Sequence, residues 1–565
     1  MAQSFDRRSL LKAGAAVIAA PHLWVAARAD VSVWPTQTVR PFVEVAIHSG
    51  RIRGGHSRGA LAFKGIPYAG SVSGRNRFKE APPVTPWTGV REATRLGPPA
   101  MQGPGTTYGE HEPAYSEDCL VLNVWTPAVN DGGRRPVMFY CHGGGFITGS
   151  GGQNIQDGAH LAATYDVVVV AINHRLGLFG YLYLGELGGN EYATSGNQGM
   201  LDIIAALRWV RENIATFGGD PGNVLLFGES GGGQKTATLM AMPAAQGFFH
   251  KAGIQSGAKL RGYPRDIATE TARRLLAGLG LGPHQVDRLA EVPAEKLIAI
   301  QLAGNMREGP LSVPSRDYLA GQADAPPGIT ALLTARSGDW GPVVDGAFLP
   351  RDPFEPNAPA LAAAVPLLIG NTHDEAIFFH RDEPGYFHAS AGQVAALARS
   401  KLGDVADRVL AFYRRTMPDA TPAEHAIAAE TATFMGNNSA LLADRKSLQP
   451  APVYRYRDDF RSSVPIAGTD WTLRACHASD IAIVFYNYEM TDLQGHGPGL
   501  PAVSQAMSSY FATFARSGVP SAQGQPDWPR YDTRTRAVML LDSRCRVALD
   551  PNGEERKFWR SLGWT

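Results

Sequence analysis

Cysteine is scarce in this chain, with four among 565 residues. So few thiols exclude a small scaffold that depends on many disulfides. The net charge is also small, formally +1, from 53 basic and 52 acidic residues. Nucleic-acid-binding proteins concentrate positive charge, so this balance argues against nucleic acid as a partner. Hydrophobic residues still make up 44% of the chain and charged residues 19%, which is ample material for a large core.

Several motifs that bind cofactors are missing. The chain has no His-Glu-x-x-His sequence and no cysteine pair at metal-binding spacing. No dinucleotide fingerprint is followed by the acidic residue it requires, and a phosphate loop fails because Gln234 separates Gly233 from Lys235. We therefore expect no metal and no cofactor. The four cysteines allow three full pairings, but we expect no structural disulfide, and Cys141 is interpreted as a small core residue on a strand.

Long hydrophobic runs are missing after residue 29, where no apolar run reaches 18 residues. A bilayer span needs about 20 such residues, so we expect no membrane span and a soluble mature chain. The first 29 residues have the parts of a secretory signal peptide: a basic start, a short apolar run over Ala13–Ala20, and Ala27-Arg28-Ala29 as a cleavage site. Arg7-Arg8 resembles the twin-arginine export signal.

Cleavage near Ala29 removes four basic residues and one acidic residue, so the net charge changes from +1 to about −2. We predict a periplasmic or secreted protein that meets the twin-arginine export machinery during secretion. Residues 30–565 are predicted to form a single domain. Its oligomeric state is left open.

Short β-branched runs alternate with helical patterns from Val137 to Met242. We expect strands over Val137–Cys141, Asp166–Asn173 and Val224–Phe227, and helices over Gly199–Phe217 and after Ser230. Such alternation predicts an α/β fold, with a large, mostly parallel sheet and crossover helices. Residues 258–364 are interpreted as insertions over this sheet.

The C-terminal third continues the pattern. We expect strands over Val365–Asn371 and Val453–Asp458, helices in 391–445, and a helix over Met507–Ser517 that ends at Gly518. Thr421-Pro422-Ala423-Glu424 forms a capping box with proline at the first helical position, which predicts a helix start.

One serine stands in a G-x-S-x-G motif, Gly228-Glu229-Ser230-Gly231-Gly232, between an expected strand and an expected helix. A sharp strand-to-helix turn lifts the serine above the sheet and places it at a helix N-terminus, where negative charge is favoured. The five residues alone also fit a glycine-rich turn, but their context favours Ser230 as a nucleophile.

A second glycine motif, His142-Gly143-Gly144-Gly145-Phe146, follows the expected strand Val137–Cys141. Motifs of this HGGG type supply backbone N–H donors to a tetrahedral oxyanion. Glycine is needed there because the backbone itself approaches the substrate closely. Alone this motif also fits a flexible turn; together with the serine motif it indicates acyl-transfer chemistry.

These motifs lie within a wider resemblance to the type-B carboxylesterase family, which includes the cholinesterases. The resemblance covers nearly the whole mature chain and suggests a bacterial exported member. The matching segments are Phe63–Ala69, Ser116–Val124, Asn173–Gly177, Phe217–Pro221, Gln255–Gly257 and Trp528–Tyr531.

The family resemblance implies an α/β-hydrolase fold and a catalytic triad in the chain order Ser, Glu, His. Carried onto this sequence, it makes Ser230 the nucleophile, Glu375 the acid and His477 the base. It also implies an oxyanion hole formed by the N–H groups of Gly144, Gly145 and Gly231. Asp374 is the alternative acid, adjacent to Glu375 in sequence.

Three features depart from the family pattern. Gly231 replaces the alanine that usually follows the nucleophile, and Ala376 replaces the glycine common after the acid. Secreted eukaryotic members pair the cysteine at Cys119 with an earlier one, but no cysteine occurs from 1 to 118. That disulfide is therefore absent.

The sequence thus predicts an exported serine carboxylesterase that forms an acyl-enzyme with a small-molecule ester. Amide, carbamate, lactone or complex natural-product ester hydrolysis remains an alternative, as does a non-catalytic binding module. Thr107–Glu110 contains no Trp where cholinesterases place one against choline, so weak or no choline ester preference is expected. Aromatic residues that could line the pocket are Tyr108, Phe146, Trp340, Phe378, Phe379 and Phe434.

Overall fold

The computed structural model describes residues 42–103, 114–302 and 340–564. The predicted signal peptide and Tyr108 lie outside the described residues. The described residues all belong to one unit of the chain.

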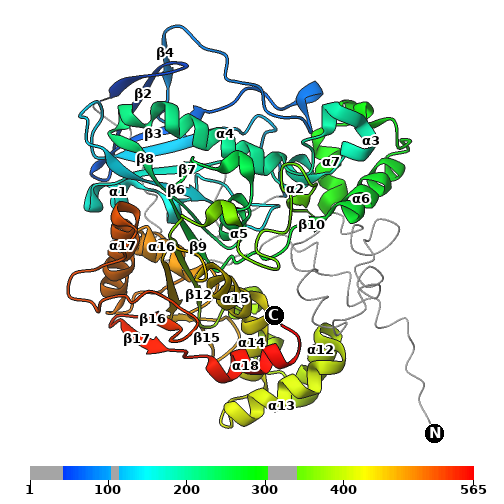
Figure 1. Ribbon diagram of the computed structural model, residues 1–565, viewed down its shortest axis with the longest axis vertical. Helices are drawn as coiled ribbons and strands as arrows, with labels where there is room; N and C mark the ends of the chain where they lie inside the picture. Colours follow the sequence, from blue (N-terminus) through cyan, green and yellow to red (C-terminus); the bar gives the residue numbers. More distant parts are fainter. Residues whose placement is uncertain (1–41, 104–113, 303–339, 565) are drawn as a thin grey trace. The chain divides into compact units, whose positions relative to one another are not determined.

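A sheet of 13 strands runs through the unit in the order β1-β2-β3-β5-β7-β6-β8-β9-β12-β13-β16-β17, with β4 paired to β2 (Figure 1). The strands are β1 (Val43–Ile47), β2 (Gly50–Ser57), β3 (Ala60–Pro67), β4 (Val90–Glu92), β5 (Val121–Thr126), β6 (Arg135–Cys141), β7 (Val168–Ile172), β8 (Gly219–Glu229), β9 (Lys251–Gln255), β12 (Leu367–Thr372), β13 (Val453–Asp458), β16 (Ala537–Leu541) and β17 (Arg546–Leu549). All pairs from β7 to β16 are parallel. The path from β1 to β7 and the β16–β17 pair are antiparallel.

Helices and two small sheets complete the described structure. The helices are α1 (Ala159–Tyr165), α2 (Gly177–Tyr181), α3 (Gly185–Gly188), α4 (Gln198–Asn213), α5 (Gly231–Leu239), α6 (Arg265–Gly278), α7 (Ala294–Leu302), α10 (Ile377–His380), α11 (Pro384–Phe387), α12 (Ala391–Leu402), α13 (Ala406–Thr416), α14 (Pro422–Thr431), α15 (Asn437–Lys446), α16 (Ser479–Val484), α17 (Leu500–Ser517) and α18 (Gly553–Ser561). The small sheets pair β10 (Tyr263–Pro264) with β11 (Val343–Val344), and β14 (Ser462–Pro465) with β15 (Thr472–Arg474).

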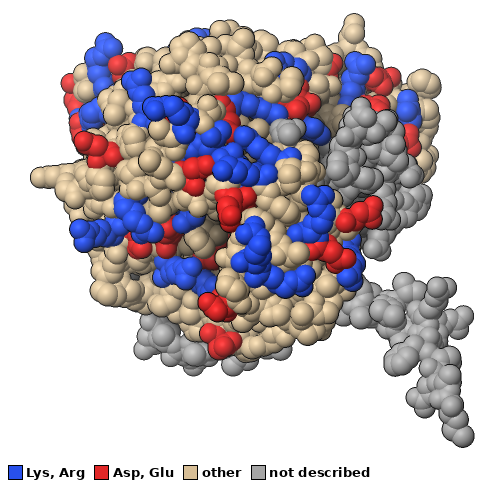
Figure 2. Space-filling view, turned by 60° about the horizontal axis from the view of Figure 1, so that its bottom comes forward, with Lys and Arg blue, Asp and Glu red and all other residues tan. Residues whose placement is uncertain are grey.

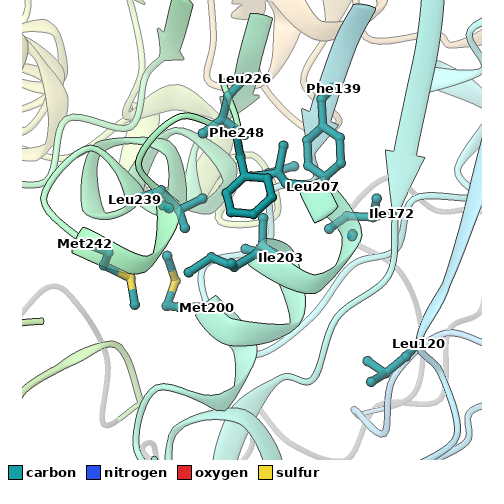
Figure 3. Close-up of a cluster of buried hydrophobic side chains, with 14 of the residues drawn as sticks. Leu120, Phe139, Ile172, Met200, Ile203, Leu207, Leu226, Leu239, Met242 and Phe248 are labelled. Carbon is teal, nitrogen blue, oxygen red and sulfur yellow. The ribbon is translucent and has the colours of Figure 1, made fainter. Parts of the chain in front are cut away.

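The central strands are apolar on both faces because helices cover both. On one face Phe139, Ile172 and Leu226 pack against α4, through side chains that include Ile203 and Leu207 (Figure 3). On the other face alternate residues of the same strands join a second core with α1, α16 and α17. Successive side chains of a strand point to opposite faces of the sheet, and here both sets are apolar. Such strands are typical of a parallel sheet that is buried on both faces.

Most of the predicted elements are confirmed, with changed ends. The expected strand Val453–Asp458 matches β13, and the capping box at Thr421 is formed at the start of α14. β8 extends back to Gly219, because its first residues pair with β6 across an irregular register. α17 begins at Leu500 instead of Met507, with proline in its first turn, and ends at Gly518 with φ of +77°.

Charged side chains of both signs are intermixed on the face shown in Figure 2. That distribution agrees with the small net charge. Among the described residues, no helix combines the length and the apolar character that crossing a membrane requires.

Candidate active site

Ser230 lies at a sharp turn between β8 and α5. The strand ends at Glu229 and the helix begins at Gly231, which leaves Ser230 with φ of +53° and ψ of −121°. This backbone region is costly for a residue with a side chain, and two hydrogen bonds hold it. The Ser230 N–H donates to the carbonyl of Gln255 at 2.8 Å, and its own carbonyl accepts from the N–H of Gln234 at 2.9 Å.

The second glycine motif follows β6 and lies against this turn. Gly144 and Gly145 have φ of +79° and +61°, a region in which glycine is unstrained. A Cβ added to Gly231 would overlap the carbonyl of Gly145, so the loop and the first turn of α5 touch backbone to backbone. The structure therefore brings the three residues expected to supply N–H donors into one place.

The expected acid and base come from two other loops. Glu375 follows β12, and His477 lies between β15 and α16. His477 Nδ1 lies 2.5 Å from Glu375 Oε2, and both residues are buried. The other oxygen, Glu375 Oε1, accepts from the Ser256 hydroxyl at 2.6 Å and from the Thr372 N–H at 2.7 Å. The carboxylate is thus held in place from both sides.

Asp374, the alternative acid, faces elsewhere. Its carboxylate lies 3.1 Å from His373 Nδ1 and 3.9 Å from Arg461 Nε. Burial opposes ionisation of Asp374, but the neighbouring His373 side chain and the nearby arginines lower its pKa overall. Ala376 has φ of −67°, which alanine adopts freely, so the departure from the family's glycine leaves the turn unstrained.

A cavity of about 530 Å³ lies next to Asp374, between α13, α14, α18 and β13. Arg455, Arg457 and Arg474 are among its lining residues. Ser230, Glu375 and His477 do not line it, so this cavity is separate from the predicted triad.

Glu229, for which the sequence predicted no role, lies on the other side of the imidazole. Its Oε1 is 3.3 Å from His477 Nε2, and the side chain is fully buried. Burial raises the pKa of Glu229. Burial also opposes protonation of His477, but Glu229 and Glu375 outweigh it and raise the pKa of His477. The two carboxyl groups therefore favour the protonated form of His477.

Asp480 extends this acidic surrounding. Its Oδ2 accepts from the Gln255 amide at 3.0 Å and from the Tyr456 hydroxyl at 2.9 Å. Burial raises the pKa of Asp480 to about 6. In the sequence, the one indication of a role for Glu229 is its position inside the serine motif. For Asp480 it is the position three residues after His477.

Three aromatic rings surround His477. Phe379, Phe434 and Phe378 have ring centroids 5.0, 5.5 and 5.9 Å from the imidazole. Phe379 is 47% exposed, whereas Phe146 and Trp340 are buried in the core. Of the described aromatic candidates, Phe378, Phe379 and Phe434 are therefore those that lie beside the base.

All four cysteines are buried free thiols. Burial raises the pKa of Cys476, the neighbour of His477, so this thiol does not compete as a nucleophile. Within 42–103, 114–302 and 340–564, no three His, Cys, Asp or Glu side chains are grouped to hold a metal ion.

The doubly covered parallel sheet, with a serine at the turn after a central strand, defines the α/β-hydrolase class. Comparison with known proteins narrows this class. Residues 41–559 match the model of the carboxylesterase family. The chain is 35% identical to para-nitrobenzyl esterase of Bacillus subtilis (strain 168) over 519 residues, covering 91% of this chain and 97% of that protein. It is 31% identical to phenmedipham hydrolase of Pseudarthrobacter oxydans, covering 87% and 94% of the two chains.

A solved structure agrees with the sequence matches. The carboxylesterase EST55 of Geobacillus stearothermophilus superposes with a TM-score of 0.76 at 35% identity, over 91% of this chain and 99% of that one. This chain belongs to the carboxylesterase family, and its enzyme class is carboxylic ester hydrolase. The predicted α/β-hydrolase fold is confirmed.

Proposed function

We propose that the protein hydrolyses carboxylic esters through an acyl-enzyme on Ser230, with His477 as base and Glu375 as the acid that orients it. The observation that carries this proposal is the buried 2.5 Å contact between His477 and Glu375. Glu375 is in the shorter contact, on Nδ1, so Nε2, which lies 3.3 Å from Glu229 Oε1, is the nitrogen proposed to accept the proton.

In the first half-reaction the Ser230 hydroxyl attacks the ester carbonyl carbon while Nε2 of His477 takes its proton. The carbonyl oxygen becomes an oxyanion that accepts from the N–H groups of Gly144, Gly145 and Gly231. The imidazolium then gives its proton to the leaving alcohol as the C–O bond breaks. Water attacks the acyl-enzyme by the same steps, which releases the acid and restores Ser230.

The negative surroundings of His477 support this assignment. The proton transfer creates an imidazolium between Glu375 and Glu229, which lie on its two nitrogens. Opposite charges this close stabilise the protonated form. The filled triad positions disfavour a non-catalytic binding module.

The nucleophile is tested by intact-mass analysis after treatment with a fluorophosphonate, on wild type and on Ser230→Ala. We expect one adduct on wild type, mapped to the Ser230 peptide, and none on the variant. Turnover of Ser230→Ala should fall by up to ~10⁶. An adduct elsewhere, or turnover retained by the folded variant, would refute the assignment and favour the binding module.

Substrate class needs a separate panel. The Bacillus subtilis relative is named for para-nitrobenzyl esters, and the aromatic rings beside His477 suit an aromatic group, so a para-nitrobenzyl ester is the first substrate to test. Matched amides, carbamates and lactones distinguish simple ester hydrolysis from the alternatives. Greater kcat/KM for any of these would replace esters as the substrate class.

We propose also that residues 1–29 direct twin-arginine export and are removed near Ala29. The Arg7-Arg8 pair, the apolar run and the small-residue site support this. Sequencing the N-terminus of protein recovered from the periplasm or medium tests it, with Arg7→Lys/Arg8→Lys as the variant that should stay in the cytoplasm. A mature N-terminus at Met1 would contradict the proposal.

A further inference from the structure

Lys235 is a fully buried lysine on α5, five residues after Ser230. Its Nζ donates to the carbonyl of His142 at 3.0 Å and to the carbonyl of Gly145 at 2.9 Å. The ammonium also lies 5.5 Å from the centroid of the Phe146 ring. Among the described residues, no carboxylate forms an ion pair with it. The Lys235 ammonium therefore donates its hydrogen bonds to the backbone of the glycine loop.

Each backbone carbonyl of the glycine loop, from His142 to Gly145, accepts a hydrogen bond. His142 Nδ1 lies 2.9 Å from the carbonyl of Gly143, and since a carbonyl only accepts, Nδ1 carries the proton. The carbonyl of Gly144 accepts from the N–H groups of Ile147 and Thr148 at 3.3 and 3.2 Å. With the two bonds from Lys235, four consecutive carbonyls from His142 to Gly145 have donors.

A peptide unit is planar, and its N–H points opposite to its C=O. The carbonyls of Gly143 and Gly144 belong to the same peptide units as the N–H groups of Gly144 and Gly145. Holding each carbonyl therefore aims the two N–H groups expected to bind the oxyanion. The two bonds from Lys235 lie on either side of these peptide units and fix both ends of the segment.

We propose that Lys235 is a positioning residue that holds the His142–Gly145 loop in the geometry of an oxyanion hole. The inference rests on the function proposed above, because it concerns how that hole is built. Lys235 does not touch the substrate in this account. It acts through the backbone of the loop, and its positive charge adds to the field that favours an oxyanion.

The glycines of α5 make this contact possible. Cβ atoms at Gly231 and Gly232 would overlap the carbonyls of Gly145 and Cys141, so in this chain the two glycines let the loop lie directly on the helix. Because the loop lies this close to α5, the Lys235 side chain, one turn further along the helix, reaches both ends of the loop. Burial lowers the pKa of Lys235 to about 7, a cost that a merely space-filling methionine would avoid.

The experiment compares Lys235→Met, Lys235→Gln and wild type with two inhibitors of the same carbon skeleton. A trifluoromethyl ketone forms a tetrahedral adduct with an oxyanion, whereas the matching methyl ketone stays largely planar. We expect Lys235→Met to lower kcat by ~10–100-fold and trifluoromethyl ketone affinity by a similar factor, less than the ~10²–10³-fold found when an oxyanion-hole donor is removed, because the N–H groups themselves remain. KM and methyl ketone affinity should stay within about 2-fold, and Lys235→Gln, which keeps an N–H donor, should recover part of the loss.

Lys259→Met is the matched control. Lys259 is also buried and lies 5.4 Å from the Phe146 ring, but it donates no hydrogen bond to the His142–Gly145 loop. We expect it to leave the preference for the trifluoromethyl ketone unchanged. Equal losses of both inhibitors in Lys235→Met, or an equal effect of Lys259→Met, would overturn the inference.

The two proposals fail in different ways. If wild type binds the trifluoromethyl ketone no more tightly than the methyl ketone, the proposed acyl-enzyme function fails. If wild type discriminates and Lys235→Met discriminates equally, only the role of Lys235 fails. Thermal unfolding of each variant shows whether a loss of activity comes from a damaged fold. A damaged fold would lower the affinity for both inhibitors and leave the ratio of the two affinities unchanged.

Discussion

The surroundings of Ser230 and the surroundings of His477, the two halves of the candidate active site, consist of different chemical groups. Around Ser230 the surroundings are mainly backbone: a strained turn, a glycine loop and one buried ammonium on Lys235. Around His477 they are mainly side chains, with Glu375 and Glu229 on its two nitrogens and Asp480 nearby. The first half is suited to a negative oxyanion and the second to a positive imidazolium.

Burial is common to both halves, and its effects on pKa have opposite signs. It lowers the pKa of Lys235 to about 7 and raises that of Asp480 to about 6. Removing a charge from water disfavours the charged form, whichever its sign. Each half therefore bears an electrostatic cost at rest that the charge formed in the proposed reaction would offset. Substitutions on either side test this comparison.

Glu375→Gln should have the largest effect of the substitutions that test the comparison. An amide at Oε2 presents N–H instead of an acceptor to His477 Nδ1 and favours the wrong tautomer. We expect kcat to fall by ~10⁴, as when a triad carboxylate becomes an amide. Steady-state kinetics with a para-nitrobenzyl ester measure this.

Asp374→Asn is its matched control, since the two carboxylates are adjacent in sequence. The Asp374 carboxylate faces His373 and Arg461, so we expect less than a ~10-fold change in kcat, since no bond to His477 is lost. Similar losses in both variants would show that negative charge near the loop matters more than the contact with Nδ1. The two-sided description of the site would then be wrong.

The sequence predicts the half of the site around Ser230 better than the half around His477. The Ser230 turn and the glycine loop are contiguous motifs that follow predicted strands, so local patterns locate them. His477 and Glu375 are 102 residues apart, and only the family resemblance brought them together. The contacts of Lys235 and Glu229 require knowledge of which loops meet above the sheet. No local pattern contains that information.

The sheet shows a similar limit. The parallel strands β6, β7, β8, β12 and β13 were predicted from their apolar runs, whereas the parallel strands β9 and β16 were not. The antiparallel strands from β1 to β5 were not predicted. β2 contains three glycines and two arginines, and β4 is exposed throughout. These residues have low strand propensity, and pairing with neighbours decides their conformation.

Gly231→Ala should have an intermediate effect, on the backbone half. Its Cβ would overlap the carbonyl of Gly145 and push the loop away from Lys235. Because misplacement by about 1 Å can cost ~10²-fold, we expect kcat to fall by ~10–100-fold with little change in KM. The variant combined with Lys235→Met should lose less than the product of the two single losses, since both disturb one contact. Fully multiplicative losses would mean that the two residues act independently.

Apart from the Asp374→Asn control, Glu229→Gln should have the smallest effect on rate, but it should have a directional effect on pH dependence. His477 accepts a proton only when it is neutral, and Glu229 raises the pKa of His477 when it is ionised, although burial raises the pKa of Glu229 itself to about 8. Removing that charge lowers the pKa of His477, so the acid limb of kcat/KM should move to lower pH by about one unit or more. At the optimum kcat should fall by roughly 10-fold, because the imidazolium loses one of its two carboxylates. An unmoved acid limb with a lower rate would instead mean that Glu229 shapes the turn at Ser230, and the base half would then depend on Glu375 alone.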